Sequence, residues 1–159
     1  MDKKLMAIMA TEGLIGLSPA QIGRLSPDQI GGLSPDQIGW LSPDVKIIYE
    51  KFMASIPRID KPYSQLLADI KSKKRKHEQS TFGPDCDAET NICGTAMCTA
   101  GHLVNMAGVE GYALKSKYGF ANAARYIHYK SRPDAPCQDF GNIPNEWALA
   151  YIEARAEEE

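Results

Sequence analysis

Residues 17–48 read LSPAQIGR, LSPDQIGG, LSPDQIGW and LSPDVKII, four octads that share Leu-Ser-Pro at their start. Residues 9–16, MATEGLIG, fit the same register as a degenerate first octad, so the repeat covers residues 9–48. A short repeated unit buries its apolar face only against its neighbours, so the repeat has to be interpreted before any other feature.

Each octad predicts one to two turns of helix with its own start and end. The serine can accept a hydrogen bond from a free backbone N–H, proline fits the first helical position, and glutamine can close a capping box. Glycine at the seventh position permits the left-handed turn that ends a helix. One continuous helix is excluded, because each internal proline costs about 3 kcal/mol. A single helix this short is unstable in water, so the repeat predicts a solenoid-like stack of helical turns.

The leucines and isoleucines of the octads form the predicted interaction surface. Near-identical units present the same apolar side chains at a fixed spacing, which suits docking of a protein partner or head-to-tail self-association. Two alternatives are a folded extension that only lengthens the domain and a flexible spacer, although recurring Leu and Ile argue against disorder. Trp40 is expected to fill the junction with the following domain. The surface comprises Leu17, Ile22, Leu25, Ile30, Leu33, Ile38, Trp40 and Leu41.

The chain after the repeat predicts a small helical domain, so the expected fold class is mostly α. The predicted organisation is a lead-in at residues 1–8, octads at 9–48 and a helical domain at 49–159, with a cysteine-rich loop and helix at 82–108. Helices are predicted from apolar residues at helical spacing and from proline or glycine residues that break the pattern. Their expected ranges are 42 to about 56, 60 to about 71, 95–107, 119–130 and a last helix that begins after Pro144. The last helix is expected to fray at residues 157–159. No stretch alternates convincingly with the period of a strand.

Composition limits the classes of partner. The 159 residues contain 18 Lys and Arg against 20 Asp and Glu, for a net charge of −2, which excludes a general polyanion binder. No apolar run approaches the roughly 20 residues that a membrane helix needs, and no signal peptide is evident, so we expect a cytoplasmic protein. The basic run at residues 71–76 is expected to be a solvated helix end rather than a phosphate contact. Neither nucleic acid nor membrane is an expected partner.

Three of the four cysteines lie close together with a histidine. The spacing C-x6-C-x4-C-x3-H joins Cys86, Cys93, Cys98 and His102, which is a permissive match to a four-ligand zinc site. No cofactor is the leading expectation, and zinc is the alternative.

Two other interpretations of the cysteines remain open. In the first, Cys93 lies just before a helix that begins near Thr95, where the helix dipole favours a thiolate, and His102 or His128 is its base. The catalytic residues would then be Cys93 and His102. In the second, which we favour, the cysteines are simply buried, as free cysteines often are.

One segment resembles a known group of proteins. Phe82 followed by Cys93-Gly94-Thr95-x-x-Cys98-x-x-Gly101-His102 is similar to a segment of small uncharacterised bacterial and phage proteins. Some of these also carry N-terminal Leu-(Ser/Thr)-Pro-(Asp/Glu)-Gln units. The resemblance covers about residues 45–110 and implies a phage association but no catalytic residues. Such proteins often have tryptophan in place of His102, which weakens the roles that need this histidine as ligand or base.

The sequence therefore favours a non-enzymatic protein that binds a protein partner or itself through the octads and forms a homo-oligomer. A zinc-stabilised binding domain is the first alternative. A cysteine-nucleophile enzyme centred on Cys93 is the second.

Overall fold

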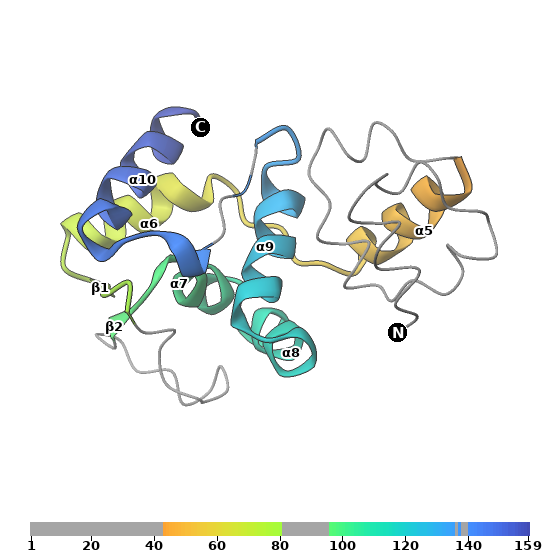
Figure 1. The fold of residues 1–159 in the computed structure, drawn as a ribbon, viewed down its shortest axis with the longest axis horizontal. Coiled ribbons are helices and arrows are strands. Elements are labelled where there is room, and N and C mark those ends of the chain that lie inside the picture. Colours follow the sequence, from red (N-terminus) through yellow and green to blue (C-terminus); the bar gives the residue numbers. More distant parts are fainter. Residues whose placement is uncertain (1–42, 81–95, 136, 138–139) are drawn as a thin grey trace.

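A computed structural model describes residues 43–80, 96–135, 137 and 140–159, and this part of the chain is mostly helical (Figure 1). The mostly α fold class is confirmed, while the predicted solenoid of octads lies outside the described residues. The helices are α5 (Pro43–Ala54), α6 (Pro62–Lys71), α7 (Thr99–Met106), α8 (Gly108–Tyr118), α9 (Phe120–Ser131) and α10 (Asn145–Glu157), with a short 3₁₀ helix at Phe140–Asn142. Two-residue strands β1 (Lys76–His77) and β2 (Ala96–Met97) pair in parallel.

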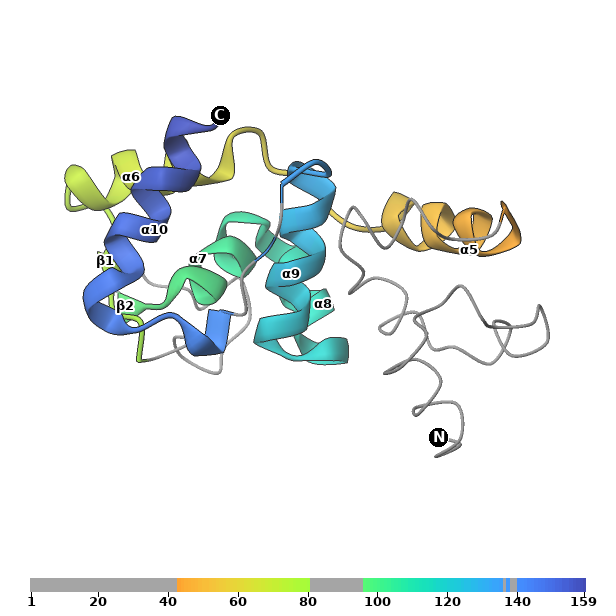
Figure 2. The ribbon, with the colours of Figure 1, turned by 45° about the horizontal axis from the view of Figure 1, so that its top comes forward.

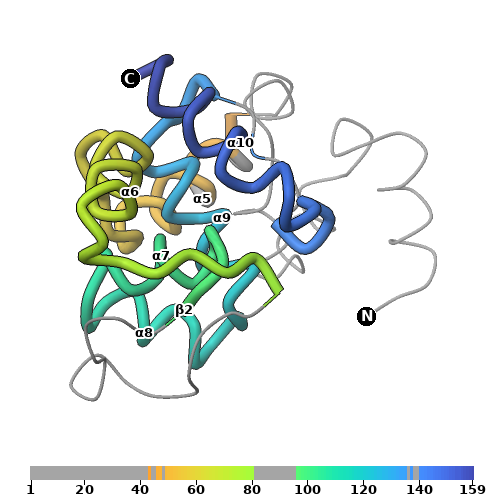
Figure 3. Tube along the Cα trace, turned by 90° about the vertical axis from the view of Figure 1, so that its left-hand side faces the viewer, coloured from red at the N-terminus to blue at the C-terminus, as the bar shows by residue number. Residues whose placement is uncertain are grey.

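The core forms around α7 and α9, which pack against each other and against α8. The α6 and α10 helices form a second pair, and Figure 3 shows them side by side although residues 72–144 separate them in the sequence. Small residues on α9, Ala123 and Ala124, are fully buried and allow close helix packing. The largest fully buried side chains include Tyr63, Leu66, Leu103, Tyr126, Ile127 and Ile152.

The α5 helix connects the end of the repeat to this core. It runs without interruption through residues 48 and 49, as expected for a last octad that continues into a longer helix. Phe52 makes edge-to-face contacts with Tyr118 and Tyr126, with ring centroids 6.0 and 5.1 Å apart. Met53 is buried as well. The body of α5 lies to one side of the other helices (Figure 2). Tyr49, Phe52 and Met53, all in its second half, contact the core.

The predicted start of the third helix, near Thr95, is wrong. Ala96 and Met97 form β2, and the α7 helix begins at Thr99 with Cys98 as its N-cap residue. Pairing with β1 places Met97 opposite His77 and buries the Met97 side chain. The expectation that Cys93 immediately precedes a helix is therefore wrong too, because Cys98 occupies that position.

The α8 helix was not predicted. The helix predicted over residues 95–107 does end before Gly108, whose φ is 62°, but the chain enters α8 at once. The apolar pattern did not reveal α8, because Gly111 and Tyr112 are its only buried residues. At Gly111 a Cβ atom would lie 2.2 Å from the carbonyl oxygen of Val104, so glycine is what permits the close approach of α8 to α7.

The C-terminal acidic residues do not fray. The α10 helix continues to Glu157, and the side chain of Glu159 is only 3% exposed. Tertiary contacts with α6 order this end of the helix, which the local sequence gives no reason to expect.

Candidate functional site

All eight predicted interaction residues and two of the four cysteines lie outside the described residues. This applies to Leu17, Ile22, Leu25, Ile30, Leu33, Ile38, Trp40 and Leu41, and to Cys86 and Cys93. Their roles stay predictions. The structure does place Cys98 and His102, together with two further histidines.

Cys98 caps the α7 helix. Its Sγ accepts a hydrogen bond from the backbone N–H of Gly101 at 3.4 Å, and the residue is 2% exposed. Burial raises the pKa of the Cys98 thiol, while backbone N–H groups at the helix start partly oppose this shift. The thiolate, not the thiol, is the nucleophile and metal ligand, so this environment favours a capping and packing role for Cys98.

His102 lies four residues after Cys98 and is fully buried on α7. Its Nε2 lies 3.2 Å from the carbonyl oxygen of Lys76 on β1. A carbonyl oxygen only accepts hydrogen bonds, so Nε2 carries the proton and Nδ1 keeps a free lone pair. Burial, assisted by the nearby His77 and Arg75, lowers the pKa of His102 to about 3. The ring is therefore neutral at physiological pH.

His77 is the residue near this site that the sequence did not single out. It lies on β1, and its ring is nearly parallel to that of His102, with centroids 5.6 Å apart and an angle of 25° between the planes. Burial lowers the pKa of His77, and the neighbouring Glu78 partly opposes the shift. No sequence signal could have found it, because only the parallel pairing of β1 with β2 brings residue 77 to residue 102. Within the described part of the chain, no three His, Cys, Asp or Glu side chains converge as a metal site.

His128, the other suggested base, is held between two hydrogen-bonding partners. Its Nε2 donates to the carbonyl oxygen of Ala135 at 3.1 Å, which leaves Nδ1 to accept from the hydroxyl of Tyr63 at 2.7 Å. Burial lowers the pKa of His128 to about 4, and Arg132 and Arg155 act in the same direction. With both ring nitrogens engaged, His128 fixes the packing of α9 against α6.

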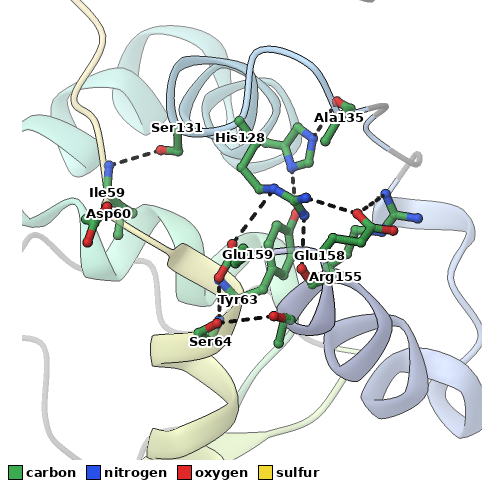
Figure 4. Close-up of polar contacts among 12 residues, drawn as sticks. Ile59, Asp60, Tyr63, Ser64, His128, Ser131, Ala135, Arg155, Glu158 and Glu159 are labelled. Atoms are coloured by element: carbon green, nitrogen blue, oxygen red, sulfur yellow. Dashed lines mark hydrogen bonds and ion pairs between the residues drawn. The ribbon is translucent and has the colours of Figure 1, made fainter.

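A polar cluster surrounds the N-terminus of α6, where Figure 4 shows its contacts. Both carboxylate oxygens of Glu159 accept backbone N–H groups, from Tyr63 at 3.1 Å and from Ser64 at 2.8 Å. The first N–H groups of a helix have no partner within the helix, and its dipole favours a negative charge there. Glu159 therefore caps α6 from the end of α10.

Arg132 completes this cluster from the end of α9. Its guanidinium donates to the carboxylate of Glu158 at 3.0 Å and to the carbonyl oxygen of Arg155 at 3.1 Å. It also lies over the ring of Tyr63. An open pocket of about 670 Å³ lies beside these groups. Because the arginine and glutamate charges lining it bind one another, the cluster fits a structural role better than a ligand site.

The basic run forms ion pairs within the domain. Arg75 and Lys74 both bind Asp69, at 2.9 and 3.2 Å, and Lys71 lies 3.5 Å from Glu153 on α10. Burial raises the pKa of Asp69, but hydrogen bonds from Arg75 and Lys74 outweigh this effect and lower it overall. These ion pairs partly neutralise the basic residues, so less positive charge is left to bind a phosphate backbone.

Comparison with known proteins bears on the N-terminal repeat. Residues 6–43 match the ALTTAQ repeat family, which covers almost all of the predicted octads. The chain matches no curated protein and no solved structure. Among the described residues, no helix is long and apolar enough to cross a bilayer.

Proposed function

We propose that this chain is a non-enzymatic interaction protein that associates with itself, or with a protein partner, through the leucines and isoleucines of its octads. The observation that carries the proposal is the repeat itself, a match to a repeat family over residues 6–43 with apolar residues at a fixed spacing. Units this short gain stability only by packing on other surfaces. Further copies of the octads offer such a surface.

The geometry of α5 supports this proposal. The matched segment ends at residue 43, where α5 begins. The C-terminal end of α5 is anchored in the core by Phe52 and Met53. A repeat that leads directly into an anchored helix is attached to the folded domain without a long linker. Such an attachment favours assembly, because the repeat has less conformational entropy to lose when it associates.

The helical domain itself gives little support for catalysis. His128 has both ring nitrogens in hydrogen bonds, and Cys98 is a buried thiol that caps a helix. The buried polar groups at the α6 N-terminus bind one another. These observations favour a domain whose polar interior serves stability, and they leave the repeat as the feature best suited to a function.

Light scattering coupled to size-exclusion chromatography tests the proposal on the full chain. We expect the wild type to be oligomeric. The double variant Ile30→Asp with Ile38→Asp should form an assembly of clearly lower mass, because two apolar side chains of the interaction surface are replaced by charged ones. The matched control is Gln29→Asp with Gln37→Asp, which introduces the same residues at adjacent polar positions and should keep the wild-type mass. A monomeric wild type, or equal masses for both variants, would contradict self-association.

A further inference from the structure

The segment that follows α6 runs beside α10. Lys71 lies 3.5 Å from Glu153, and the backbone N–H of Gln79 donates to the side-chain oxygen of Asn145 at 3.0 Å. Glu153 and Asn145 are about two turns apart on the helix, so both ends of the segment are held along this stretch. Figure 3 shows the segment continuing from α6 and passing α10. Residues 71–79 and the first half of α10 therefore share one face of the molecule.

This face carries a basic strip, which consists of Lys73 and Lys76. Both residues are exposed, and neither forms an ion pair with the residues that the structure describes. Lys74 and Arg75, which lie between them in the sequence, bind Asp69 instead. The strip therefore keeps two positive charges that no described carboxylate compensates.

An acidic strip on α10 lies next to it and consists of Glu146 and Glu153. Glu146 is exposed and forms no ion pair within the described part of the chain. Glu153 contacts Lys71, but the two side chains are 43% and 63% exposed, and ion pairs so open to solvent bind weakly. Both carboxylates can therefore bind a cation from outside the chain.

Leu149 lies between the two strips. It precedes Glu153 by one turn of α10 and so shares the side of the helix that faces residues 71–79. This leucine is 43% exposed, and Trp147, beside Glu146, is 68% exposed. Apolar side chains surrounded by charged ones are the usual composition of a protein interface.

The two strips make this face complementary to itself. A two-fold axis that runs along α10 through Leu149 places the basic strip of each copy over the acidic strip of the other. Glu146 then meets the partner's Lys76, and Glu153 meets the partner's Lys73, because each pair lies at the same level along α10. The two Leu149 side chains meet on the axis. A partner with charges of one sign would match only one strip, so the observations favour a second copy of this chain.

We propose that the chain forms a two-fold symmetric dimer through the face shared by α10 and residues 71–79. The ion pairs between the copies determine the orientation of the dimer, and the exposed apolar side chains of α10 supply the contact between them. The proposal is independent of the role proposed for the octads, because it uses none of their residues. With both surfaces active, each chain would associate in two ways.

Mixing two charge-reversed full-length chains tests the dimer. One chain carries Lys73→Glu with Lys76→Glu, the other carries Glu146→Lys with Glu153→Lys, and both also carry the two octad substitutions given above. Light scattering coupled to size-exclusion chromatography should show a dimer for the octad variant alone and half that mass for each reversed chain. Their equimolar mixture should return to the dimer mass, because every contact between unlike chains again joins opposite charges.

A substitution at the centre of the face provides a second readout. Leu149→Asp, in the octad variant, should halve the mass, because it places two like charges together on the two-fold axis. Val109→Asp is the matched control, since Val109 is an apolar residue of α8 that is 71% exposed, and it should leave the dimer intact. Both positions are exposed, so the circular dichroism of the two variants should match that of the parent chain. High salt should weaken the dimer by screening its ion pairs.

Three results would overturn the dimer: a monomeric octad variant, a mixture of the two reversed chains that stays monomeric, or equal masses for Leu149→Asp and Val109→Asp. A failure of the octad model has a different signature. In that case the wild type would be a dimer, and the octad variant would keep the same mass, which supports the α10 face and contradicts association through the octads.

Discussion

One residue near the C-terminal end of the sequence, Glu159, stabilises α6, a helix that begins almost a hundred residues earlier. The carboxylate of Glu159 binds the backbone N–H groups of Tyr63 and Ser64 at the start of α6. The local sequence provides no such cap, because Lys61 is the N-cap residue and its side chain makes no capping hydrogen bond. Glu159 thus does from a distance what serine or aspartate usually does within a helix.

We expect Glu159→Ala to lower the free energy of unfolding by about 1–2 kcal/mol, the usual cost of losing an N-cap. Glu157→Ala is the matched control, since Glu157 has the same charge, is exposed and lies two residues earlier, at the end of α10. It should change stability by less than about 0.5 kcal/mol. Urea unfolding followed by circular dichroism measures both variants, and equal effects would show that charge rather than the cap is responsible.

The buried pair of Tyr63 and His128 makes stability depend on pH. In the folded state the pKa of His128 is about 4, below the value of about 6.5 for an unfolded chain. Its contribution is therefore fully present above pH 6.5 and is lost as the pH falls from there towards 4, because the unfolded state binds the proton first. This direction follows from burial of the neutral ring.

We expect His128→Gln to flatten the pH dependence of stability between pH 6.5 and 4. One proton fewer taken up on unfolding reduces the slope by up to about 1.4 kcal/mol per pH unit. Glutamine can still accept from Tyr63 and donate to Ala135, so the variant should fold. Urea midpoints at several pH values within this window test it, and an unchanged slope would contradict the assigned role of His128.

At the scale of elements, the close packing of α8 on α7 depends on Gly111. The carbonyl oxygen of Val104 and the Cβ of Ala107 lie 2.2 and 2.8 Å from where a Cβ at position 111 would be. The first of these is a backbone atom, which cannot move without shifting α7. Helical periodicity did not predict α8, because the helix packs on α7 through a glycine, which adds no apolar side chain to the sequence pattern.

We expect Gly111→Ala to destabilise the protein by about 1–3 kcal/mol, the usual cost of overpacking, although alanine is the better helix former. Glu110→Ala, at the neighbouring exposed position, is the control and should be close to neutral. Thermal and urea unfolding of the two variants give the comparison. A stabilised Gly111→Ala would mean that the two helices are not in close contact.

At the scale of the whole molecule, α6 and α10 bring together distant parts of the chain. Ile152 is fully buried on α10, and the ion pair between Lys71 and Glu153 lies at the same junction. The exposed pair contributes little, typically about 0–1 kcal/mol. Apolar burial therefore holds this junction together.

We expect Ile152→Ala to cost about 2–5 kcal/mol, because it leaves a cavity at a site with no exposure. Leu149→Ala lies on the same helix, where Leu149 is 43% exposed, and it should cost less than about 1 kcal/mol. Chemical unfolding followed by circular dichroism compares them. Similar losses for the two variants would show that α10 does not anchor the fold through Ile152.

The sequence by itself determined the mostly α class, the positions of α5, α6, α9 and α10, and the repeat that residues 6–43 share with a known family. Those features follow from local rules, namely apolar spacing and the placement of proline and glycine. Only the tertiary structure decided the start of α7, the existence of α8, the cap formed by Glu159 and the pairing of His77 with His102. These four features depend on contacts between residues far apart in the sequence, or on a glycine that has no side chain. Contacts of both kinds leave no periodic pattern in the local sequence.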